Sequence, residues 1–568
     1  MKTLNLHCDY IHFKALKKAL KSVDEIAPNQ NLEGEAKDCL VVLTAIEKGD
    51  STKSVPKLVE NIKDIAGQVK TKNIVLYPYA HLSKNLGSPA TAVKILDEAA
   101  KQLDGFNVTR APFGYYKEFE LKVKGHPLSE LSREIETIEG NEEKEELSEN
   151  ERKNLLKKIS RAKLDTSKLK ENDHRIIGSK MDLWSFNNVA PGMVFWHDKG
   201  LQLKNKLIEI WRELHERENY LEVSTPQIMD KTIWEVSGHW NKYSKNNFLT
   251  NYEKRDFLIK PMNCPGGMLI YKTKTRSYKD LPLKMGELGI VHRVELSGVL
   301  AGLFRVIQFT QDDAHIFCTK DQLEEEIGKL IDLVKETFDT FNLKIDHVEL
   351  STRPENRIGE DKFWDLSENA LENVLKKRKM KYKINEGDGA FYGPKIDFHL
   401  KDSLKRNWQC STIQVDMALP ERFDLNYIDE KANEKRPILI HNAIYGSLER
   451  FLGILTEDLN GKFPLWLSPN QVKILTLNDG VNDYANKIFQ KLKQEGIRVE
   501  INTKSEPMNK KAREAQVQKF NYLLTVGEKE KSENLVAIKE RDKKTIETMK
   551  LDEFINKLKE EINKKITL

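Results

Sequence analysis

The sequence predicts a multidomain protein that combines α/β and α+β units, and three observations lead to this expectation. The 568 residues are too many for one hydrophobic core, so we expect three or four domains. Hydrophobic spacing changes repeatedly between period 2 and helical periodicity, which is typical of mixed strands and helices. An acidic block over residues 134–151 and a basic block over residues 152–170 contain few large apolar residues and divide the chain.

The first domain is expected over residues 1–140 as a compact α/β unit. Period-2 alternation near residues 4–6, 40–46, 74–79 and 119–123 predicts strands. Two amphipathic helices are expected between them, and the second starts at Ser88-Pro89, where a capping serine precedes a proline in the first turn. The apolar face of the first helix consists of Val55, Leu58, Val59, Ile62, Ala66 and Val69.

A charged helical linker is expected over residues 141–188, because a solvated helix is a commoner fate for such charge runs than a binding tail. The longest domain follows over residues 189–466. It opens with a helix that leads into Pro226, which suits a sheet edge. Residues 467–568 form a last small α/β domain that ends in a helix, a size typical of one folding unit.

Composition limits the compartment and the partners. A net charge of only +5 means that a polyanion must be met by local basic patches. The five cysteines are an odd, scattered set, which favours reduced thiols in a cytosolic compartment. No apolar run approaches the roughly 18 residues of a membrane span, and residues 1–10 do not resemble a signal peptide. We therefore expect a cytoplasmic protein with no membrane partner.

One cysteine and two histidines lie in segments that are typical of an active-site wall. Cys264, His315 and His441 are far apart in the chain, in the segments KPMNCPGG, FTQDDAHIF and IHNAIYGSLERF. Three N/S ligands leave one tetrahedral position of Zn²⁺ open, as in a working site. Taken singly, each residue is more often an ordinary buried or surface side chain.

Two period-2 runs around the loop 297–302 predict an antiparallel hairpin. Its side chains include Arg293, Glu295 and Arg305. Arginine offers forked donors for phosphate and glutamate can accept from an exocyclic amine, so adenosine triphosphate would suit this hairpin. Without other signals, Arg293 and Glu295 would more often be neighbours on a strand surface that form an exposed ion pair. The chain lacks the P-loop and Rossmann signatures of other nucleotide sites.

These segments carry a family resemblance. The helix with Pro226, the run His-Arg-Val-Glu295 and the run Gly446-Ser-Leu-Glu-Arg-Phe resemble the three signature motifs of class II aminoacyl-tRNA synthetases. The segments FTQDDAH, MNCP and WQCSTIQ are similar to the threonyl-tRNA synthetase family. The resemblance implies a six-stranded antiparallel sheet flanked by helices, a homodimer formed through the motif 1 helix, and ATP with Mg²⁺, threonine and tRNA(Thr) as ligands.

By this resemblance, Arg293 would hold the α-phosphate, Glu295 the adenine amino group and Arg305 the terminal phosphate. Phe309 and Arg450 would enclose the adenine ring. Secondary contacts to the nucleotide would come from Gln409 and Ser447. One Zn²⁺ per chain, on Cys264, His315 and His441, would bind the amino and hydroxyl groups of threonine. The rest of the threonine pocket would be Met262, Gln311, Asp313, Tyr392 and Gln414, and His239 would assist the transfer step.

Selection against serine predicts a second active site. A hydrophobic pocket separates threonine from valine by only about 100-fold, whereas a site that ligates the hydroxyl rejects valine by roughly 10⁴ or more. Serine keeps the hydroxyl and lacks one methyl group, which is worth only about 1–3 kcal/mol. A hydrolytic editing site is therefore expected.

The first domain resembles the archaeal-type editing domain related to D-aminoacyl-tRNA deacylases, through the segments YPYAHL, APFGYYK and KGHPLSEL. It differs from the editing region of bacterial threonyl enzymes, so their residues cannot be transferred. The residues expected to position the mischarged ester and its water are His81, Tyr116, Lys117 and Glu130. Lys117 could instead be a snorkelling side chain at a strand end.

The last domain resembles the anticodon-binding domain of this synthetase subgroup, with basic residues at Lys504, Lys510, Lys511, Arg513, Lys539 and Arg541. Two alternatives to a threonyl enzyme stay open. A synthetase for another amino acid would keep Arg293 and Arg450 but not the Cys/His/His pocket. A non-catalytic tRNA-binding paralogue would lose phosphate ligands, and the presence of Arg293, Arg305 and Arg450 counts against it.

Overall fold

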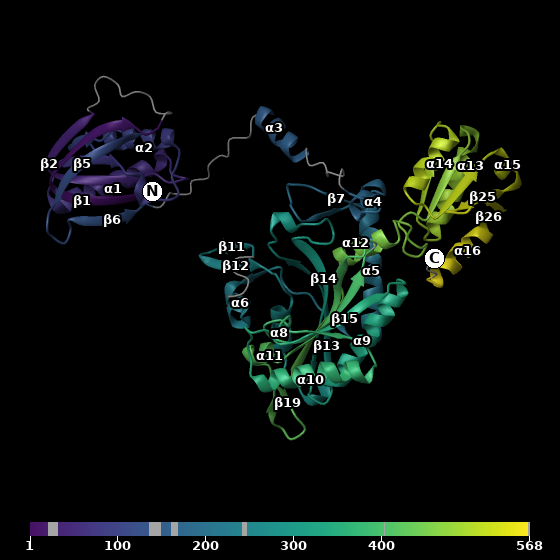
Figure 1. Cartoon of the computed structure of the whole chain (residues 1–568). Helices are drawn as coiled ribbons and strands as arrows, with labels where there is room; N and C mark the ends of the chain where they lie inside the picture. The colour runs from purple at the N-terminus through teal and green to yellow at the C-terminus, as the bar shows by residue number, and fades with distance from the viewer. Residues whose placement is uncertain (21–31, 136–148, 161–168, 241–246, 403, 566–568) are drawn as a thin grey trace. The chain divides into compact units, whose positions relative to one another are not determined.

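The structure, a computed structural model, describes residues 1–20, 32–135, 149–160, 169–240, 247–402 and 404–565 (Figure 1). The chain divides into two units, Met1–Glu151 and Arg152–Leu568, which are described separately. The second unit contains a large core that belongs to the middle domain and a separate core that belongs to the last domain. Together with the first unit, this confirms the expected three-domain architecture.

The first unit is an α/β domain built on a six-stranded sheet of order β4-β3-β2-β1-β5, with β6 also paired to β1. Strands β2, β3 and β4 are parallel to one another, and β1 is antiparallel to β2, β5 and β6. The strands are β1 (Lys2–Lys18), β2 (Glu33–Ala45), β3 (Asn73–Pro78), β4 (Asn107–Arg110), β5 (Tyr115–Val123) and β6 (Glu130–Glu134).

Two helices, α1 (Val55–Val69) and α2 (Pro89–Gln102), pack against this sheet. The α1 side chains predicted to be apolar contacts are buried, except for Val69 at the helix end. Helix α2 begins where the sequence predicts it, and the Ser88 side chain accepts a hydrogen bond from the backbone N–H of Thr91. The capped first turn therefore explains why α2 starts at the predicted position.

The predicted linker is only partly described. Helix α3 (Glu149–Ser160) exposes its described side chains up to residue 159, in agreement with a solvated helix. The predicted linker residues 141–148 and 161–168 lie outside the described residues. At the other end the prediction ran too far, because α4 (His174–Lys180) and β7 (Trp184–Phe186) bury Ile177, Met181, Leu183 and Trp184 in the middle-domain core. Because these apolar residues are few and lie among many charged residues, the sequence did not indicate that this segment is buried.

The middle domain is built on an eight-stranded sheet of order β16-β15-β17-β18-β21-β14-β13-β9. The six inner strands are antiparallel to their neighbours, as the resemblance implied. One short parallel strand is added at each edge. The strands are β9 (Leu221–Glu222), β13 (Leu283–His292), β14 (Gln308–Cys318), β15 (Ile345–Ser351), β16 (Lys383–Asn385), β17 (Lys395–Lys401), β18 (Asn407–Asp416) and β21 (Ile438–Ser447).

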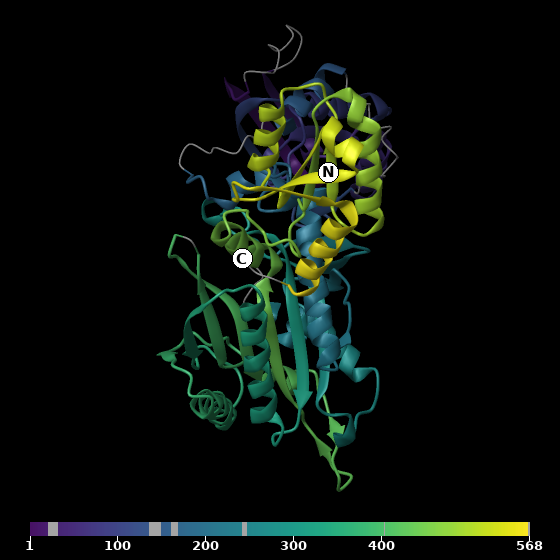
Figure 2. The same ribbon diagram turned by 90° about the vertical axis from the view of Figure 1, so that its right-hand side faces the viewer.

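Side-chain alternation gives this sheet one apolar and one polar face. Val348 and Leu350 of β15 and Phe398 of β17 share a core with residues of helices α9 (Leu323–Thr340) and α10 (Asp361–Lys377). The long strands run beside one another in both views (Figures 1 and 2). Because successive side chains of a strand point to opposite faces, the intervening polar residues collect on the other face.

Other elements of this domain lie around the sheet, and α5 (Asp198–Arg217) and α12 (Leu448–Asp458) share the core of α9 and α10. Helix α5 buries apolar residues that recur at helical spacing, including Leu203, Leu207 and Trp211. The elements around the sheet are β8 (Val194–Trp196), α5 (Asp198–Arg217), β10 (Ile228–Asp230), α6 (Lys231–Ser237), β11 (Leu249–Tyr252), β12 (Arg255–Ile259), α8 (Cys264–Lys272), α11 (Ala418–Arg422), β19 (Tyr427–Ile428), β20 (Glu434–Lys435) and α12 (Leu448–Asp458).

The last domain has a five-stranded sheet of order β23-β22-β24-β25-β26. Strands β22, β23 and β24 are parallel, and β25 and β26 extend them as an antiparallel pair. The elements are β22 (Val472–Thr476), α13 (Asn482–Gln494), β23 (Val499–Asn502), α14 (Met508–Val517), β24 (Tyr522–Val526), α15 (Glu528–Glu533), β25 (Leu535–Glu540), β26 (Ile546–Lys550) and α16 (Leu551–Asn563). Within the described parts of the chain, every helix is too short or too polar to cross a membrane.

Candidate functional site

Three side chains from separate elements meet on the polar face of the middle-domain sheet. Cys264 is the first residue of α8, and His315 in β14 lies opposite His441 in β21 in the strand register. One ligand atom from each residue lies within 4.8 Å of the other two, and all three residues are buried. The Nε2 atom of His315 has no hydrogen-bond partner among the described residues. The structure thus brings the predicted trio together.

Asp416 orients one of these histidines. Its Oδ2 atom accepts a hydrogen bond from His441 Nε2 at 2.9 Å, and its Oδ1 atom accepts from the backbone N–H groups of Ala418 and Leu419. With Nε2 engaged, Nδ1 of His441 is left as the ligand atom. Such a carboxylate–histidine pair is common around zinc. Together with the open fourth position, the thiol and two imidazoles fit Zn²⁺.

Burial dominates the electrostatics of this cluster. It raises the pKa of the Cys264 thiol well above its usual range, and nearby Asp313 raises it further. The same burial lowers the pKa of His315, which favours a neutral ring. A neutral imidazole is the form that binds a metal ion.

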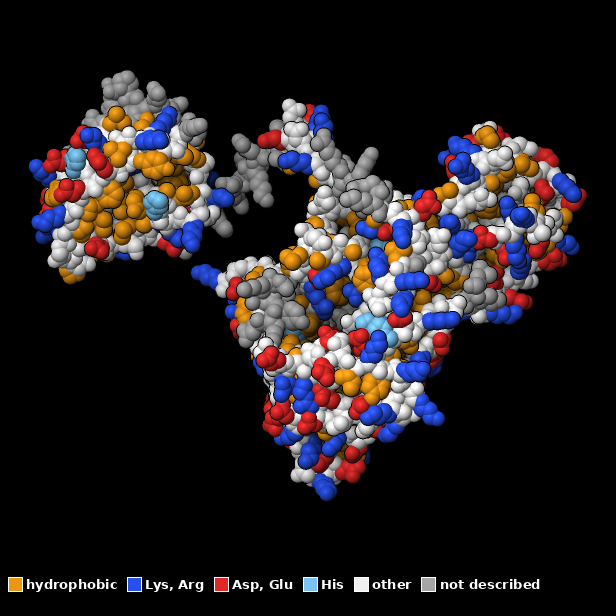
Figure 3. Space-filling model, in the orientation of Figure 1, with side chains coloured by type: hydrophobic (Ala, Val, Ile, Leu, Met, Phe, Trp, Pro, Cys, Tyr) orange, Lys and Arg blue, Asp and Glu red, His pale blue; other side chains and the backbone are white. Residues whose placement is uncertain are grey.

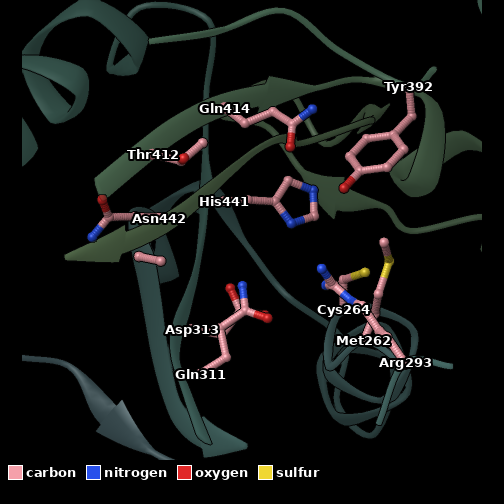
Figure 4. Close-up of a pocket in the computed structure, with 11 residues that line it drawn as sticks. Met262, Cys264, Arg293, Gln311, Asp313, Tyr392, Thr412, Gln414, His441 and Asn442 are labelled. Atoms are coloured by element: carbon pink, nitrogen blue, oxygen red, sulfur yellow. The ribbon is translucent and has the colours of Figure 1, made fainter. Parts of the chain in front are cut away.

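A cavity of about 80 Å³ opens beside the trio (Figure 4). The five predicted threonine-pocket residues, Met262, Gln311, Asp313, Tyr392 and Gln414, all line it together with Cys264, His441 and Arg293. Three further lining residues were not predicted, namely Thr412, Asn442 and Ala443. Thr412 precedes Gln414 by two positions in β18, so period-2 alternation could have found it.

The sequence also did not reveal the role of Asp312, which is fully buried. Its carboxylate accepts hydrogen bonds from the backbone N–H groups of Ile444, Tyr445 and Gly446 at 2.8–2.9 Å. Burial raises the pKa of Asp312 to about 7, although the three N–H donors oppose this shift. Asp312 therefore fixes the backbone just before Ser447, where α12 begins.

The predicted phosphate-binding arginines lie near this cavity with defined partners. The Arg293 guanidinium lies 5.2 Å from the centre of the Phe309 ring and donates to the carbonyl of Pro261. Arg305 pairs with Glu295 at 2.8 Å. The Arg305 side chain is 48% exposed, so this pair leaves it accessible to an incoming anion. The Arg293 guanidinium thus lies over the Phe309 ring, and the Arg450 guanidinium lies 5.6 Å from the centre of the Trp408 ring.

Arg450 joins two other predicted nucleotide contacts. It donates to the backbone carbonyl of Gln409 at 2.9 Å, and burial lowers its pKa from the usual value. The Gln409 side chain donates to Asp397 Oδ1, which also accepts from the Thr412 hydroxyl. Ser447 caps α12 by accepting a hydrogen bond from the Arg450 backbone N–H. These contacts hold the Arg450, Gln409 and Ser447 side chains in place.

His239 lies close to the pocket through aromatic contacts. Its ring centre is 5.9 Å from that of Tyr392, and its Nδ1 atom is 2.8 Å from the Ser237 hydroxyl. Burial lowers the pKa of His239 to about 3, so the ring is neutral at physiological pH.

The N-terminal unit contains a larger cavity of about 530 Å³, lined mainly by apolar and aromatic residues. Hydrophobic side chains gather on the visible face of this unit (Figure 3). His81, Tyr116 and Lys117 all line the cavity. The Lys117 ammonium donates to the carbonyls of Pro112 and Tyr115 at 2.9 and 3.3 Å. Burial lowers the pKa of Lys117 to about 8.

Glu130 does not join the other predicted editing residues. Lys117 lies opposite Ala15 in β1, whereas Glu130 lies opposite Leu6 of the same strand. A separation of nine residues along a strand is about 30 Å at roughly 3.3 Å per residue. The expectation that Glu130 lies near Lys117 was therefore wrong, because β5 and β6 pair with different halves of β1.

Two of the predicted basic contacts in the last domain have structural partners instead. Lys511 is buried and donates to the carbonyl of Thr476, because this side of α14 faces the sheet. Arg541 donates to the carbonyls of Lys519, Lys462 and Phe463. Neither side chain is free for a phosphate group.

The antiparallel sheet with its arginine-lined cavity defines the core of a class II aminoacyl-tRNA synthetase. Residues 248–459 match the family described as "tRNA synthetase class II core domain (G, H, P, S and T)". Residues 1–135 match "Archaea-specific editing domain of threonyl-tRNA synthetase", and residues 471–561 match "Anticodon binding domain". The chain belongs to the threonyl-tRNA synthetase family.

Individual relatives agree with this assignment. The threonine–tRNA ligase of Desulforamulus reducens is 49% identical over 396 residues, which are 70% of this chain and 62% of the relative. The chain thus aligns with less than two thirds of the length of such curated relatives.

Solved structures give the same family. The RNA-binding domain of threonyl-tRNA synthetase from Cryptosporidium parvum has a TM-score of 0.66 and 40% identity, covering 68% of this chain and 98% of that one. The putative threonyl-tRNA synthetase ThrRS-1 from Aeropyrum pernix has a TM-score of 0.61 and 28% identity, covering 69% and 97%.

Proposed function

We propose that the chain activates threonine with ATP and transfers it to tRNA(Thr). The observation that carries this proposal is the meeting of Cys264, His315 and His441 beside a cavity lined by Asp313 and Gln311. Zn²⁺ held by the three side chains would take the amino and hydroxyl groups of threonine as two further ligands, because catalytic zinc can exceed four ligands. The Asp313 carboxylate would accept a hydrogen bond from the same hydroxyl and hold it in one orientation.

The chain's own residues would then position ATP. Arg293 and Arg305 supply fixed donors for the phosphates, and Mg²⁺ would accompany ATP as part of the substrate. Phe309 and Arg450 would hold the adenine between them. Glu295 pairs with Arg305 in this structure. It would leave this pair to accept a hydrogen bond from the adenine amino group. Ser447 and Gln409 complete the nucleotide contacts. Positioning and charge neutralisation supply most of the rate enhancement in such reactions.

Transfer to the tRNA would take place beside His239. The His239 ring packs against Tyr392 and is neutral. A neutral imidazole has one unprotonated nitrogen, and this nitrogen would accept the proton of the attacking ribose hydroxyl. The anticodon-binding fold over residues 467–568 would hold the other end of the tRNA. We place the catalytic domain at residues 189–466, extended by α4 and β7, and infer a cytoplasmic homodimer formed through α5.

Threonine-dependent exchange of pyrophosphate into ATP tests the activation step. The zinc-loaded chain is expected to exchange with threonine and to reject valine by roughly 10⁴-fold, because valine lacks the hydroxyl that the site binds. Removal of zinc with a chelator should abolish exchange, and its return should restore it. A folded, zinc-loaded chain with no exchange would support the non-catalytic tRNA-binding paralogue, and preference for another amino acid would support a different synthetase.

The N-terminal cavity is the proposed site for hydrolysis of seryl-tRNA(Thr). The Lys117 ammonium lies at its wall and could polarise the ester carbonyl, with His81 and Tyr116 beside it. Glu130, which is remote within the unit, is not assigned to this step. We place this editing domain at residues 1–140, followed by the linker at 141–188.

The variant Lys117→Met tests this assignment. It should leave threonylation unchanged while seryl-tRNA(Thr) accumulates. Lys122→Met is a matched control, because Lys122 lies on the same strand but is exposed and pairs with Asp9. Equal deacylation rates in the Lys117→Met variant and the wild type would assign the step to other residues.

A further inference from the structure

A second group of metal-ligand side chains lies on the polar face of the middle-domain sheet, away from the Cys264 trio. His347 and Glu349 are in β15, and His399 in β17 lies opposite His347 in the register. One ligand atom of each lies within 4.8 Å of the other two. Their side chains are 17%, 21% and 16% exposed, so the group is half-buried and open to small ligands.

A neutral His347 cannot satisfy both of the carboxylates that it contacts. His347 Nδ1 lies 2.6 Å from Asp346 Oδ2, and its Nε2 lies 3.2 Å from Glu349 Oε1. A neutral imidazole has one N–H and can donate to only one of the two carboxylates, so its other nitrogen would face an acceptor. His399 Nε2, at 3.6 Å from Glu349 Oε2, has no hydrogen-bond partner among the residues that the structure describes.

The two histidine rings of this group lie face to face. The His347 and His399 rings stack with centres 4.4 Å apart and 9° between their planes, so two imidazolium charges would repel each other. Lys401 already pairs with Asp346 at 2.5 Å, which leaves Glu349 as the carboxylate between the two rings.

The spacing matches a tetrahedral metal ion. Ligand atoms about 2.0–2.1 Å from Zn²⁺ lie roughly 3.3 Å from one another in a tetrahedron. His347 Nε2 lies 3.2 Å from Glu349 Oε1 and His399 Nε2 lies 3.6 Å from Glu349 Oε2, so each histidine nitrogen is about this far from one oxygen of the carboxylate. Asp346 and Asn385, which donates to Glu349 Oε2 at 2.9 Å, would orient the ligands from behind. A shared ion requires only that the stacked rings tilt, and the terminal torsion of histidine is broad.

We propose that His347, Glu349 and His399 bind a second divalent metal ion, such as Zn²⁺, with water in the remaining position. Two imidazoles and a carboxylate form a ligand set that suits Zn²⁺ and other late first-row metals rather than Mg²⁺. This site shares no ligand with the Cys264 trio, so its occupancy is independent of the proposed threonine site.

Metal stoichiometry of the stripped, full-length chain tests the proposal. Dialysis against chelator-buffered, micromolar Zn²⁺ should load two ions on the wild type and one on Cys264→Ser. The His399→Gln and Glu349→Gln variants should each load one ion, and Cys264→Ser combined with His399→Gln should load none. His197→Gln is the matched control, since His197 contacts Asp182 and Ser185 without a second histidine, and it should load two.

With Co²⁺ in place of Zn²⁺, the thiolate charge-transfer band reports the Cys264 site alone. The Cys264→Ser variant should lose this band and keep the visible bands of a nitrogen and oxygen site. A Cys264→Ser variant that binds no metal would overturn the second site, whatever the wild type binds. Two folded variants, His399→Gln and Glu349→Gln, that load as much metal as the wild type would overturn it as well. Near-ultraviolet circular dichroism establishes that each variant is folded.

Discussion

Replacement of Asp416 by asparagine tests how the fold prepares the proposed zinc site. Asp416 accepts the Nε2–H of His441 at 2.9 Å and also accepts two backbone N–H groups at the start of α11. Asparagine can keep the backbone contacts through its oxygen, so the local fold should persist. Its NH₂ group would then face the His441 N–H, which favours the tautomer whose proton occupies the ligand nitrogen Nδ1.

The size of the effect follows from the loss of this orienting contact. Loss of such an outer carboxylate weakens metal affinity by about 10- to 100-fold, which is about 1.4–2.8 kcal/mol. Because Asp416 is fully buried, water does not replace the lost acceptor, and we expect the upper end of this range. Competition with a chromophoric chelator measures the affinity. The control is Asp429→Asn, a partly exposed aspartate that also accepts hydrogen bonds from backbone N–H groups, at Lys431 and Asn433. A wild-type zinc affinity in Asp416→Asn would refute this reasoning.

Three further predictions concern stability and editing. His174 hydrogen-bonds the buried Glu457 at 2.8 Å, so His174→Ala should lower the free energy of urea unfolding by about 3 kcal/mol, and an unchanged value would contradict a structural role. A Cβ on Gly446 would lie 2.2 Å from the carbonyl oxygen of Cys410 at φ +79°, so Gly446→Ala should cost at least about 2 kcal/mol in the same assay, whereas a wild-type midpoint would show that the strand adapts. The ammonium form of Lys117 declines as pH rises through about 8, so seryl-ester hydrolysis should fall across this range, and a rise would assign the activity to the neutral amine.

Local patterns predicted the elements well where apolar periodicity is strong. The α1 and α5 faces and the β13–β14 hairpin appear where the sequence places them. The two-residue strand β9 and the three-residue strand β16 are too short to show a period, so the added sheet edges were not predicted. The boundary before residue 189 was misplaced because a few apolar residues lie among many charged ones.

Site residues could be predicted where a sequence motif identifies them, but not where their role depends on strand register or on packing. Cys264 and the two histidines converge because strand register pairs His315 with His441. Register is also why Glu130 was misplaced, since the sequence does not reveal which half of β1 pairs with each strand. Asp312 lies in the predicted segment FTQDDAHIF, but its role could not be predicted. That role depends on three backbone N–H donors of β21, which only the fold brings to its carboxylate. The direction in which Lys511 points likewise depends on how α14 packs.

Zinc X-ray absorption of the loaded chain, with and without threonine, tests the central claim most directly. The His399→Gln variant isolates the Cys264 site for this measurement. We predict one sulfur and two imidazole ligands from the protein, and a change in the light-atom shell on addition of threonine but not of valine. Four protein ligands around zinc, or an unchanged spectrum with threonine bound, would contradict selection of the amino acid through its hydroxyl at this metal.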